Sequence, residues 1–156
     1  VRYGDILIID RVQLYKGYAC DHVRSFVCGK ATAKQKDLYK RCSERLQATL
    51  DQVKPGNTTA DVQAKLRDPD DYSETTIHFG HGIGLAIWEK PVISRMVSLE
   101  HAHVIKPGMV FALETFWPAK DGWRAARIEE EVVLTPGGAK VITLFPAQEL
   151  PIANPY

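Results

Sequence analysis

Four carboxylates and one imidazole lie on short strand-like or glycine-flanked segments of this chain: Asp10, Asp21, His81, Glu114 and Glu129. Carboxylates that converge in a partly dry site repel one another, so they become protonated or their segments separate. Divalent cations placed between the side chains remove that conflict. The sequence therefore predicts that these residues meet around metal ions, a requirement that constrains the fold more than any other feature.

The overall composition is that of one soluble globular domain with a sizeable core. The 156 residues are 45% hydrophobic and 25% charged, which is ordinary for such proteins. A net charge of +1 predicts no nucleic-acid partner, because it leaves no broad basic face. The chain has no apolar run of about 18 residues and no signal-like start, so neither a membrane span nor secretion is predicted.

The three cysteines, Cys20, Cys28 and Cys42, lack the spacing of a metal-binding motif. They predict reduced thiols in a cytoplasmic protein. A Cys20–Cys28 bridge across a hairpin is the alternative.

Strands are predicted at the start of the chain, where Asp5–Asp10 forms a short apolar segment that ends on an acid. Lys16 and Gly17 form a turn between two further strand-like segments, Val12–Tyr15 and Tyr18–Val27. Pairing about this turn places Asp10 nearly opposite Asp21. Cross-strand neighbours lie about 5 Å apart, close enough to share one metal site.

The middle of the chain predicts two helices. Apolar residues recur at helical spacing from Thr32 to Val53, and Pro55-Gly56 ends the pattern. Thr58 and Asp61 resemble a capping box that opens a shorter helix to about Leu66.

Strand patterns return in the second half, at Met109–Phe116, Arg127–Thr135 and Lys140–Leu144. Strands, then helices, then strands predict an α+β fold, with a curved antiparallel sheet covered by helices on one face.

Two of these strands carry acids in apolar surroundings. Glu114 interrupts the apolar strand, and strand alternation places Glu129 and Glu131 on one face with Glu130 on the other. Burying an unpaired carboxylate is unfavourable, so an inward-facing acid needs a compensating charge. A metal ion is the simplest one, and a salt bridge to Arg127 or Arg124 is the structural alternative.

The segments GDILIID, GHGIGL, GMVFALETF and RIEEEVVLT resemble the pita-bread metallopeptidases, which include methionine aminopeptidases, Xaa-Pro aminopeptidases, Xaa-Pro dipeptidases and creatinase. The resemblance runs from about Gly4 to Phe145, and it includes the 11-residue step between the first two aspartates. The absence of methionine-aminopeptidase features and the short step from Glu114 to Glu129 favour the Xaa-Pro branch. Residues 1–156 are then expected to be the carboxy-terminal portion of a single catalytic pita-bread domain that lacks its amino-terminal part.

This resemblance implies a two-metal site. Asp10 would bind one metal, Asp21 and Glu129 would bridge both, and His81 and Glu114 would complete the other. The ligand set suits Mn, Co, Fe or Zn. The implied activity is hydrolysis of peptide bonds by a metal-bridging hydroxide, with Glu114 as the general base. A small peptide or another small molecule would be the substrate, and the protein would form a homodimer.

One position departs from the family pattern. The peptidases carry a second histidine seven residues after the ligand histidine, and this chain has Trp88 there. Indole donates one hydrogen bond but cannot shuttle a proton. His78 is the candidate to replace the missing catalytic histidine, although strand alternation would turn it away from His81.

Trp88 leaves two alternative functions open. A non-peptidase reaction of the dimethylsulfoniopropionate lyase or creatinase kind is one, because an aromatic wall suits small cationic substrates. A non-catalytic binding module is the other. Gly80, Gly82 and Gly84 are expected to let the backbone approach the metals and the substrate closely.

Overall fold

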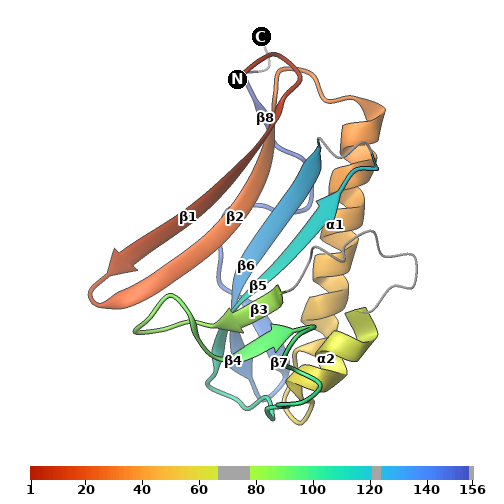
Figure 1. The fold of residues 1–156 in the computed structure, drawn as a ribbon. Helices are drawn as coiled ribbons and strands as arrows, with labels where there is room; N and C mark the ends of the chain where they lie inside the picture. The colour runs from red at the N-terminus through yellow and green to blue at the C-terminus, as the bar shows by residue number, and fades with distance from the viewer. Residues whose placement is uncertain (67–77, 121–123, 155–156) are drawn as a thin grey trace.

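The computed structural model describes residues 1–66, 78–120 and 124–154, which fold into two sheets and two helices (Figure 1). The smaller sheet has the order β1-β2-β8, and the larger has the order β4-β3-β5-β6-β7. The strands are β1 (Ile6–Tyr15), β2 (Tyr18–Cys28), β3 (His78–Gly82), β4 (Glu89–Ser94), β5 (Val110–Pro118), β6 (Ala125–Thr135), β7 (Gly138–Val141) and β8 (Ile152–Ala153). The helices are α1 (Ala33–Gln52) and α2 (Thr59–Leu66).

The β1–β2 hairpin is longer and more regular than the sequence predicts. Its first strand is continuous, so the predicted break between Asp10 and Val12 is wrong. Lys16 and Gly17 both have positive φ, 49° and 89°, as a two-residue hairpin turn of the primed type requires. This turn pairs Asp10 with Val23 and Val12 with Asp21. The two aspartates therefore share a face but lie one diagonal step apart, roughly 7–8 Å, rather than nearly opposite.

Both predicted helices are confirmed, and each begins with a capping box. The Thr32 N–H donates to Gln35 Oε1 at 2.8 Å, and the Gln35 N–H donates back to Thr32 Oγ1 at 3.3 Å. Thr58 and Asp61 exchange the equivalent bonds at 2.8 and 3.2 Å. These pairs satisfy backbone donors that a helix start leaves without partners.

The core lies between α1 and one face of β5 and β6 (Figure 1). Strand alternation sends Phe111, Leu113 and Thr115 of β5 toward the helix, where the Thr115 hydroxyl donates to the Cys42 carbonyl at 3.1 Å. The same alternation sends Glu114 to the opposite face, which lies beside the β1–β2 hairpin. This arrangement leaves a layer of acidic side chains between the two sheets.

Side chains join the two sheets where β2 lies beside β6. Ser25 Oγ accepts from the Arg127 N–H and donates to the Arg127 carbonyl, both at 2.9 Å. Glu131 Oε1 accepts from the Asp21 N–H at 2.7 Å. The predicted antiparallel sheet covered by helices is the larger sheet, in which all strand pairs are antiparallel. The structure adds a smaller sheet that no backbone ladder among the described residues joins to it, and in that sheet β8 pairs with β2 in parallel.

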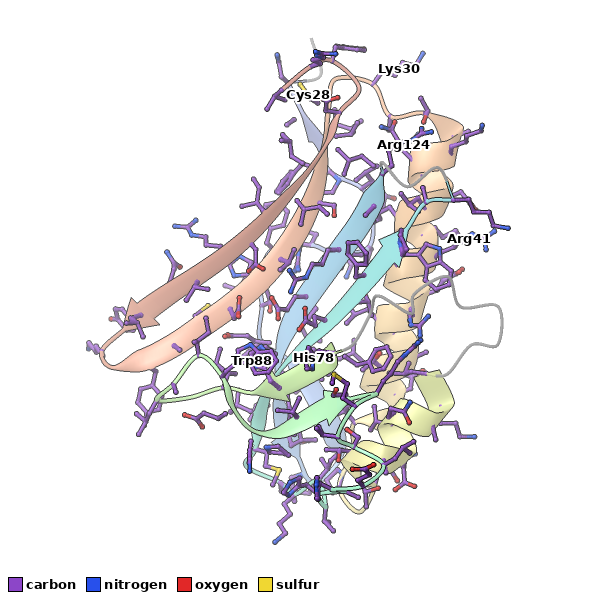
Figure 2. The ribbon with its side chains drawn as sticks, in the orientation of Figure 1. Cys28, Lys30, Arg41, His78, Trp88 and Arg124 are labelled. Carbon is purple, nitrogen blue, oxygen red and sulfur yellow. The ribbon has the colours of Figure 1, made fainter. Side chains whose placement is uncertain are left out.

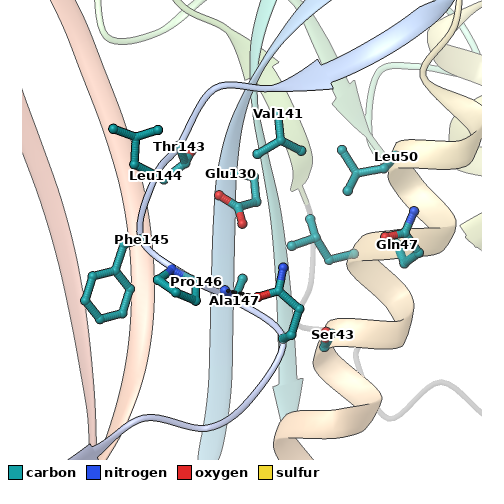
Figure 3. Close-up of a pocket in the computed structure, with 12 residues that line it drawn as sticks. Ser43, Gln47, Leu50, Glu130, Val141, Thr143, Leu144, Phe145, Pro146 and Ala147 are labelled. Carbon is teal, nitrogen blue, oxygen red and sulfur yellow. Dashed lines mark hydrogen bonds between the residues drawn. The ribbon is translucent and has the colours of Figure 1, made fainter.

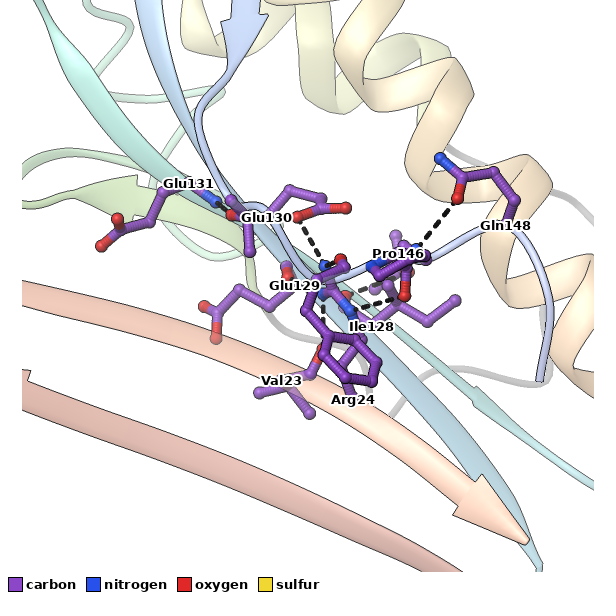
Figure 4. Close-up of polar contacts among 12 residues, drawn as sticks. Val23, Arg24, Ile128, Glu129, Glu130, Glu131, Pro146 and Gln148 are labelled. Carbon is purple, nitrogen blue, oxygen red and sulfur yellow. Dashed lines mark hydrogen bonds and ion pairs between the residues drawn. The ribbon is translucent and has the colours of Figure 1, made fainter. Parts of the chain in front are cut away.

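Arg24 ties the carboxy-terminal segment to this junction (Figure 4). Its guanidinium donates to Glu130 Oε2 at 2.8 Å and to the Pro146 carbonyl at 3.2 Å, with both charged side chains buried. Figure 4 places Glu130 on the helix side of β6, opposite Glu129, as predicted from alternation. The cysteines of the described chain are free thiols, as predicted. Neither described helix is long and apolar enough to cross a membrane.

Replacement of Arg24 with alanine is expected to lower the free energy of unfolding by about 3–5 kcal/mol, because it leaves the Glu130 charge buried without a partner. The matched control is Arg41→Ala, which removes an exposed ion pair with Asp37 on α1 and should change stability by less than about 0.5 kcal/mol. Urea titration measures both values. Equal effects of the two substitutions would contradict the role assigned to Arg24.

Candidate metal centre

The acidic layer is positioned by strand registers in the larger sheet. Glu114 of β5 lies directly opposite Glu129 of β6, and Ala112 pairs with both His81 of β3 and Glu131 of β6. Directly paired residues share a face, as do residues two apart on one strand. His81, Glu114, Glu129 and Glu131 therefore face the same side, toward the hairpin that carries Asp21.

Three of the five predicted ligands form a compact cluster. One potential ligand atom from each of Asp21, His81 and Glu129 lies within 4.8 Å of the others. His81 Nε2 is 3.9 Å from Asp21 Oδ2 and 3.9 Å from Glu129 Oε1. His81 Nδ1 lies 3.0 Å from the Gly82 carbonyl. Because a carbonyl only accepts, Nδ1 carries the proton and the Nε2 lone pair points to the carboxylates.

The electrostatics of this cluster favour a cation. Burial and the nearby Asp21 and Glu114 raise the pKa of Glu129 to about 9. Burial and the nearby Asp10 likewise raise the pKa of Asp21. Asp21 Oδ1 and Glu129 Oε2 are buried with no hydrogen-bond partner among the residues that the structure describes, although buried polar atoms normally have one. These unsatisfied oxygens and the lone pair of His81 fit a divalent metal ion, since oxygen and imidazole ligands suit such ions.

The other two predicted ligands are held by Arg127. Its guanidinium donates to Asp10 Oδ2 at 2.9 Å and to Glu114 Oε2, with Nε 3.1 Å from the same Glu114 oxygen. Burial opposes the charge of Arg127, but Glu114 and Asp10 outweigh it and raise the pKa of the guanidinium. The sequence offered a salt bridge to Arg127 and a metal site as alternative ways to compensate the buried acids. In the structure, the salt bridges of Arg127 and the cluster of possible metal ligands occur together.

Trp88 contacts both histidines of β3, and Figure 2 shows it beside His78. Its ring stacks on His81 with centroids 4.6 Å apart and an interplanar angle of 25°, and it meets His78 at 4.9 Å and 90°. A register shift between His78 and Gly80 breaks the strand alternation. The prediction that His78 faces away from His81 is therefore wrong, because both rings reach Trp88. His78 is not part of the ligand cluster.

The glycines of β3 have a different neighbour from the one expected. A Cβ at Gly80 would lie 2.7 Å from the Ala112 carbonyl oxygen, and one at Gly82 would lie 2.9 Å from the Lys90 carbonyl oxygen. These contacts are closer than side-chain carbons tolerate, so glycine here makes room for the neighbouring strands β5 and β4. That packing indirectly fixes the position of His81.

Two contributors were not assigned to the site from the sequence. Arg127 was considered only as an alternative to metal, and Glu131 only as the neighbour that shares a face with Glu129. Glu131 holds the backbone of Asp21 in place, and its i, i+2 spacing from Glu129 was the available signal.

A separate pocket of about 370 Å³ lies on the helix side of β6, between α1, β7 and residues 143–148 (Figure 3). Glu130 lines it, together with Leu46 and Gln47 of α1. Because Glu130 and Glu129 point to opposite faces of β6, this pocket is not part of the acidic cluster.

Comparison with known proteins gives a consistent family assignment. The profile of metallopeptidase family M24 matches residues 1–136. The chain is 34% identical to the Xaa-Pro dipeptidase of Pyrococcus furiosus over 149 residues, which cover 92% of this chain and 41% of that enzyme. It is 30% identical to the methionine aminopeptidase of Escherichia coli K12 over 167 residues, which cover 95% of this chain and 63% of that enzyme. The chain thus spans less than two thirds of the length of these relatives.

Solved structures give the same result for the fold. The recombinant prolidase from Thermococcus sibiricus superposes with a TM-score of 0.84 at 30% identity, and the match covers 98% of this chain and 41% of that one. The predicted pita-bread architecture is therefore confirmed, and this chain corresponds to part of the length of its relatives.

The raised pKa of Glu129 predicts how stability changes with pH when metal is removed by EDTA. Between about pH 5 and pH 9 the folded state retains a proton that the unfolded chain releases, so the free energy of unfolding falls as pH rises. The slope from this group is at most about 1.4 kcal/mol per pH unit. Urea titrations at several pH values measure it. Glu129→Gln removes the titrating group and should flatten the slope, whereas an identical slope in that variant would contradict the assignment.

Proposed function

The chain belongs to metallopeptidase family M24, and we propose that it carries the dinuclear metal centre of a hydrolase of the Xaa-Pro dipeptidase or aminopeptidase type. The observation that carries this proposal is the buried cluster of Asp21, His81 and Glu129, in which two carboxylate oxygens have no hydrogen-bond partner. A cluster of this charge is unfavourable to bury without a cation, which argues against a purely structural role.

In the proposed site, Asp10 would bind one metal, Asp21 and Glu129 would be shared by both, and His81 and Glu114 would complete the other. The contacts of Arg127 are compatible with this arrangement, because they use only Oδ2 of Asp10 and Oε2 of Glu114. Each carboxylate has a second oxygen that can bind a cation. Arg127 would then orient these two ligands, as residues that hold metal ligands do.

The two cations, which we expect to be Mn, Co, Fe or Zn, would supply acidification of a water molecule and polarisation of the scissile carbonyl. Glu114 is proposed as the general base, held in place by its hydrogen bonds from Arg127. His78 is proposed as a second catalytic residue that lines the site beside Trp88.

The substrate assignment rests on the relatives. Those in the comparisons are named Xaa-Pro dipeptidases and methionine aminopeptidases, so we propose a small peptide as the substrate. We propose the Xaa-Pro branch because the short step between Glu114 and Glu129 and the absence of methionine-aminopeptidase features favour it. A homodimer and a cytoplasmic location stay predictions.

A non-peptidase reaction at the same metal centre is the second candidate function, and Trp88 favours it. The indole occupies the position where a second histidine is expected, and its side chain is 48% exposed. Loss of a hydrogen-bond donor to a developing oxyanion typically lowers the rate by about 10²–10³. A reaction that needs no such donor, of the dimethylsulfoniopropionate lyase or creatinase kind, would be less affected by this substitution.

Glu129→Gln is expected to abolish binding of both metal ions, because the proposed role of this carboxylate is to bridge them. The neighbouring Glu130→Gln is the matched control: it makes the same change on the same strand but on the opposite face, and should bind metal as the wild type does. Calorimetric titration with Mn²⁺ and metal analysis measure the stoichiometry, and thermal melting checks the fold. Two Mn²⁺ ions retained at full occupancy by Glu129→Gln would disprove the bridging role.

Turnover assays separate the candidate reactions. With Mn²⁺ or Co²⁺ present, we expect cleavage of Xaa-Pro dipeptides to exceed turnover of methionyl peptides, creatine and dimethylsulfoniopropionate. Activity on creatine or dimethylsulfoniopropionate alone would support the second candidate and overturn the first. Trp88→His should raise the peptidase rate, because it restores a side chain that can both donate a hydrogen bond and transfer a proton. These assays use the full chain.

A further inference from the structure

We propose that Trp88 is a positioning residue for His81. The indole of Trp88 holds the imidazole plane of His81 in the orientation that metal binding requires. This inference rests on the proposed function, because it assigns a role at the same metal centre. Trp88 is not one of the ligands. It acts through the ring on which it is stacked.

The geometry restricts His81 in two independent ways. The hydrogen bond from Nδ1 to the Gly82 carbonyl, 3.0 Å long, fixes which nitrogen is free to bind. Trp88 covers the ring from one side, with centroids 4.6 Å apart and planes 25° apart, so rotation of the imidazole about its Cβ–Cγ bond would drive it into the indole. Together these contacts direct Nε2 at Asp21 and Glu129.

The segment that carries Trp88 is itself anchored. The Ala19 N–H donates to the Gly84 carbonyl at 2.7 Å, and the Ala86 N–H donates to Glu89 Oε1 at 2.7 Å. The first bond joins this segment to β2 only two residues before Asp21. The segment that carries Trp88 is therefore hydrogen-bonded to β2, the strand of Asp21, while the Trp88 ring stacks on His81.

His78 supports the indole from a second direction, edge to face at 4.9 Å. Such aromatic pairs are favourable beyond the area that they bury. Trp88 is thus the shared member of two aromatic pairs, stacked on His81 and edge to face with His78, which Figure 2 shows beside it.

The test uses Co²⁺ as the probe, since its visible absorption reports ligand geometry in addition to affinity. Trp88→Leu, which keeps an apolar side chain but removes the stack, should weaken Co²⁺ binding roughly 2- to 10-fold, the range expected for loss of one aromatic pair. It should also change the visible spectrum. Trp88→Phe retains a stacked ring and should stay within about 2-fold of the wild type with an unchanged spectrum.

Trp117→Leu is the matched control, because this tryptophan lies on β5 against Arg45 and should leave Co²⁺ binding unchanged. Wild-type affinity and spectrum in Trp88→Leu would overturn the positioning role while leaving the metal site intact. An equal loss of Co²⁺ affinity in Trp88→Leu and Trp88→Phe would show that the stacked ring is not what positions His81. Absence of Co²⁺ binding in the wild type would overturn the proposed function and this inference with it. Thermal melting in EDTA verifies that each variant is folded.

Discussion

The structure depends on compensation of the negative charge that lies between its two sheets. Asp21 reaches this layer from the hairpin, while Glu114 and Glu129 reach it from the larger sheet, all three buried. Their mutual repulsion would separate β2 from β6, since side chains rather than a backbone ladder join these strands. Arg127 supplies one positive charge to this junction, and the proposed cations would supply the rest. The same ions that carry the chemistry would therefore also hold the two sheets together.

Strand β6 shows how one short segment meets two different electrostatic requirements. Glu129 faces the hairpin, where it has no cationic partner for Oε2, while Glu130 faces the helix and pairs with buried Arg24. The two adjacent carboxylates, Glu129 and Glu130, differ in the charges that surround them. The pKa of Glu129 is raised to about 9 by burial and by other acids, whereas Glu130 has a guanidinium at 2.8 Å. The carboxylate of Glu130, paired with buried Arg24, stabilises the fold, whereas the unpaired oxygen of Glu129 is available for the proposed metal.

Much of the fold could be predicted from the sequence, because local rules determine it. The capping box at Thr58 and the face alternation of Glu129 to Glu131 depend only on neighbours along the chain, and they are confirmed. The offset of Asp10 from Asp21 was also available from the sequence, because a two-residue turn at Lys16 and Gly17 pairs Tyr15 with Tyr18 and therefore Asp10 with Val23. The contact of Arg127 with both Asp10 and Glu114 joins segments more than 100 residues apart. The position of His78 was missed because a register shift, which leaves no clear sequence signal, reverses the expected face.

The proposed metal centre and the residue beside it have separate structural origins. The proposed ligands stand on β1, β2, β3, β5 and β6, where ladder registers and glycine packing fix their positions. Trp88, in contrast, ends the short segment that connects β3 to β4, and its side chain is half exposed. A substitution at Trp88 leaves the strand registers intact, so the residue beside His81 can change while the strands that carry the proposed ligands keep their pairing. Trp88 retains contact with His81 without offering a titratable group. The family fold can thus keep its metal site while the chemistry beside it changes.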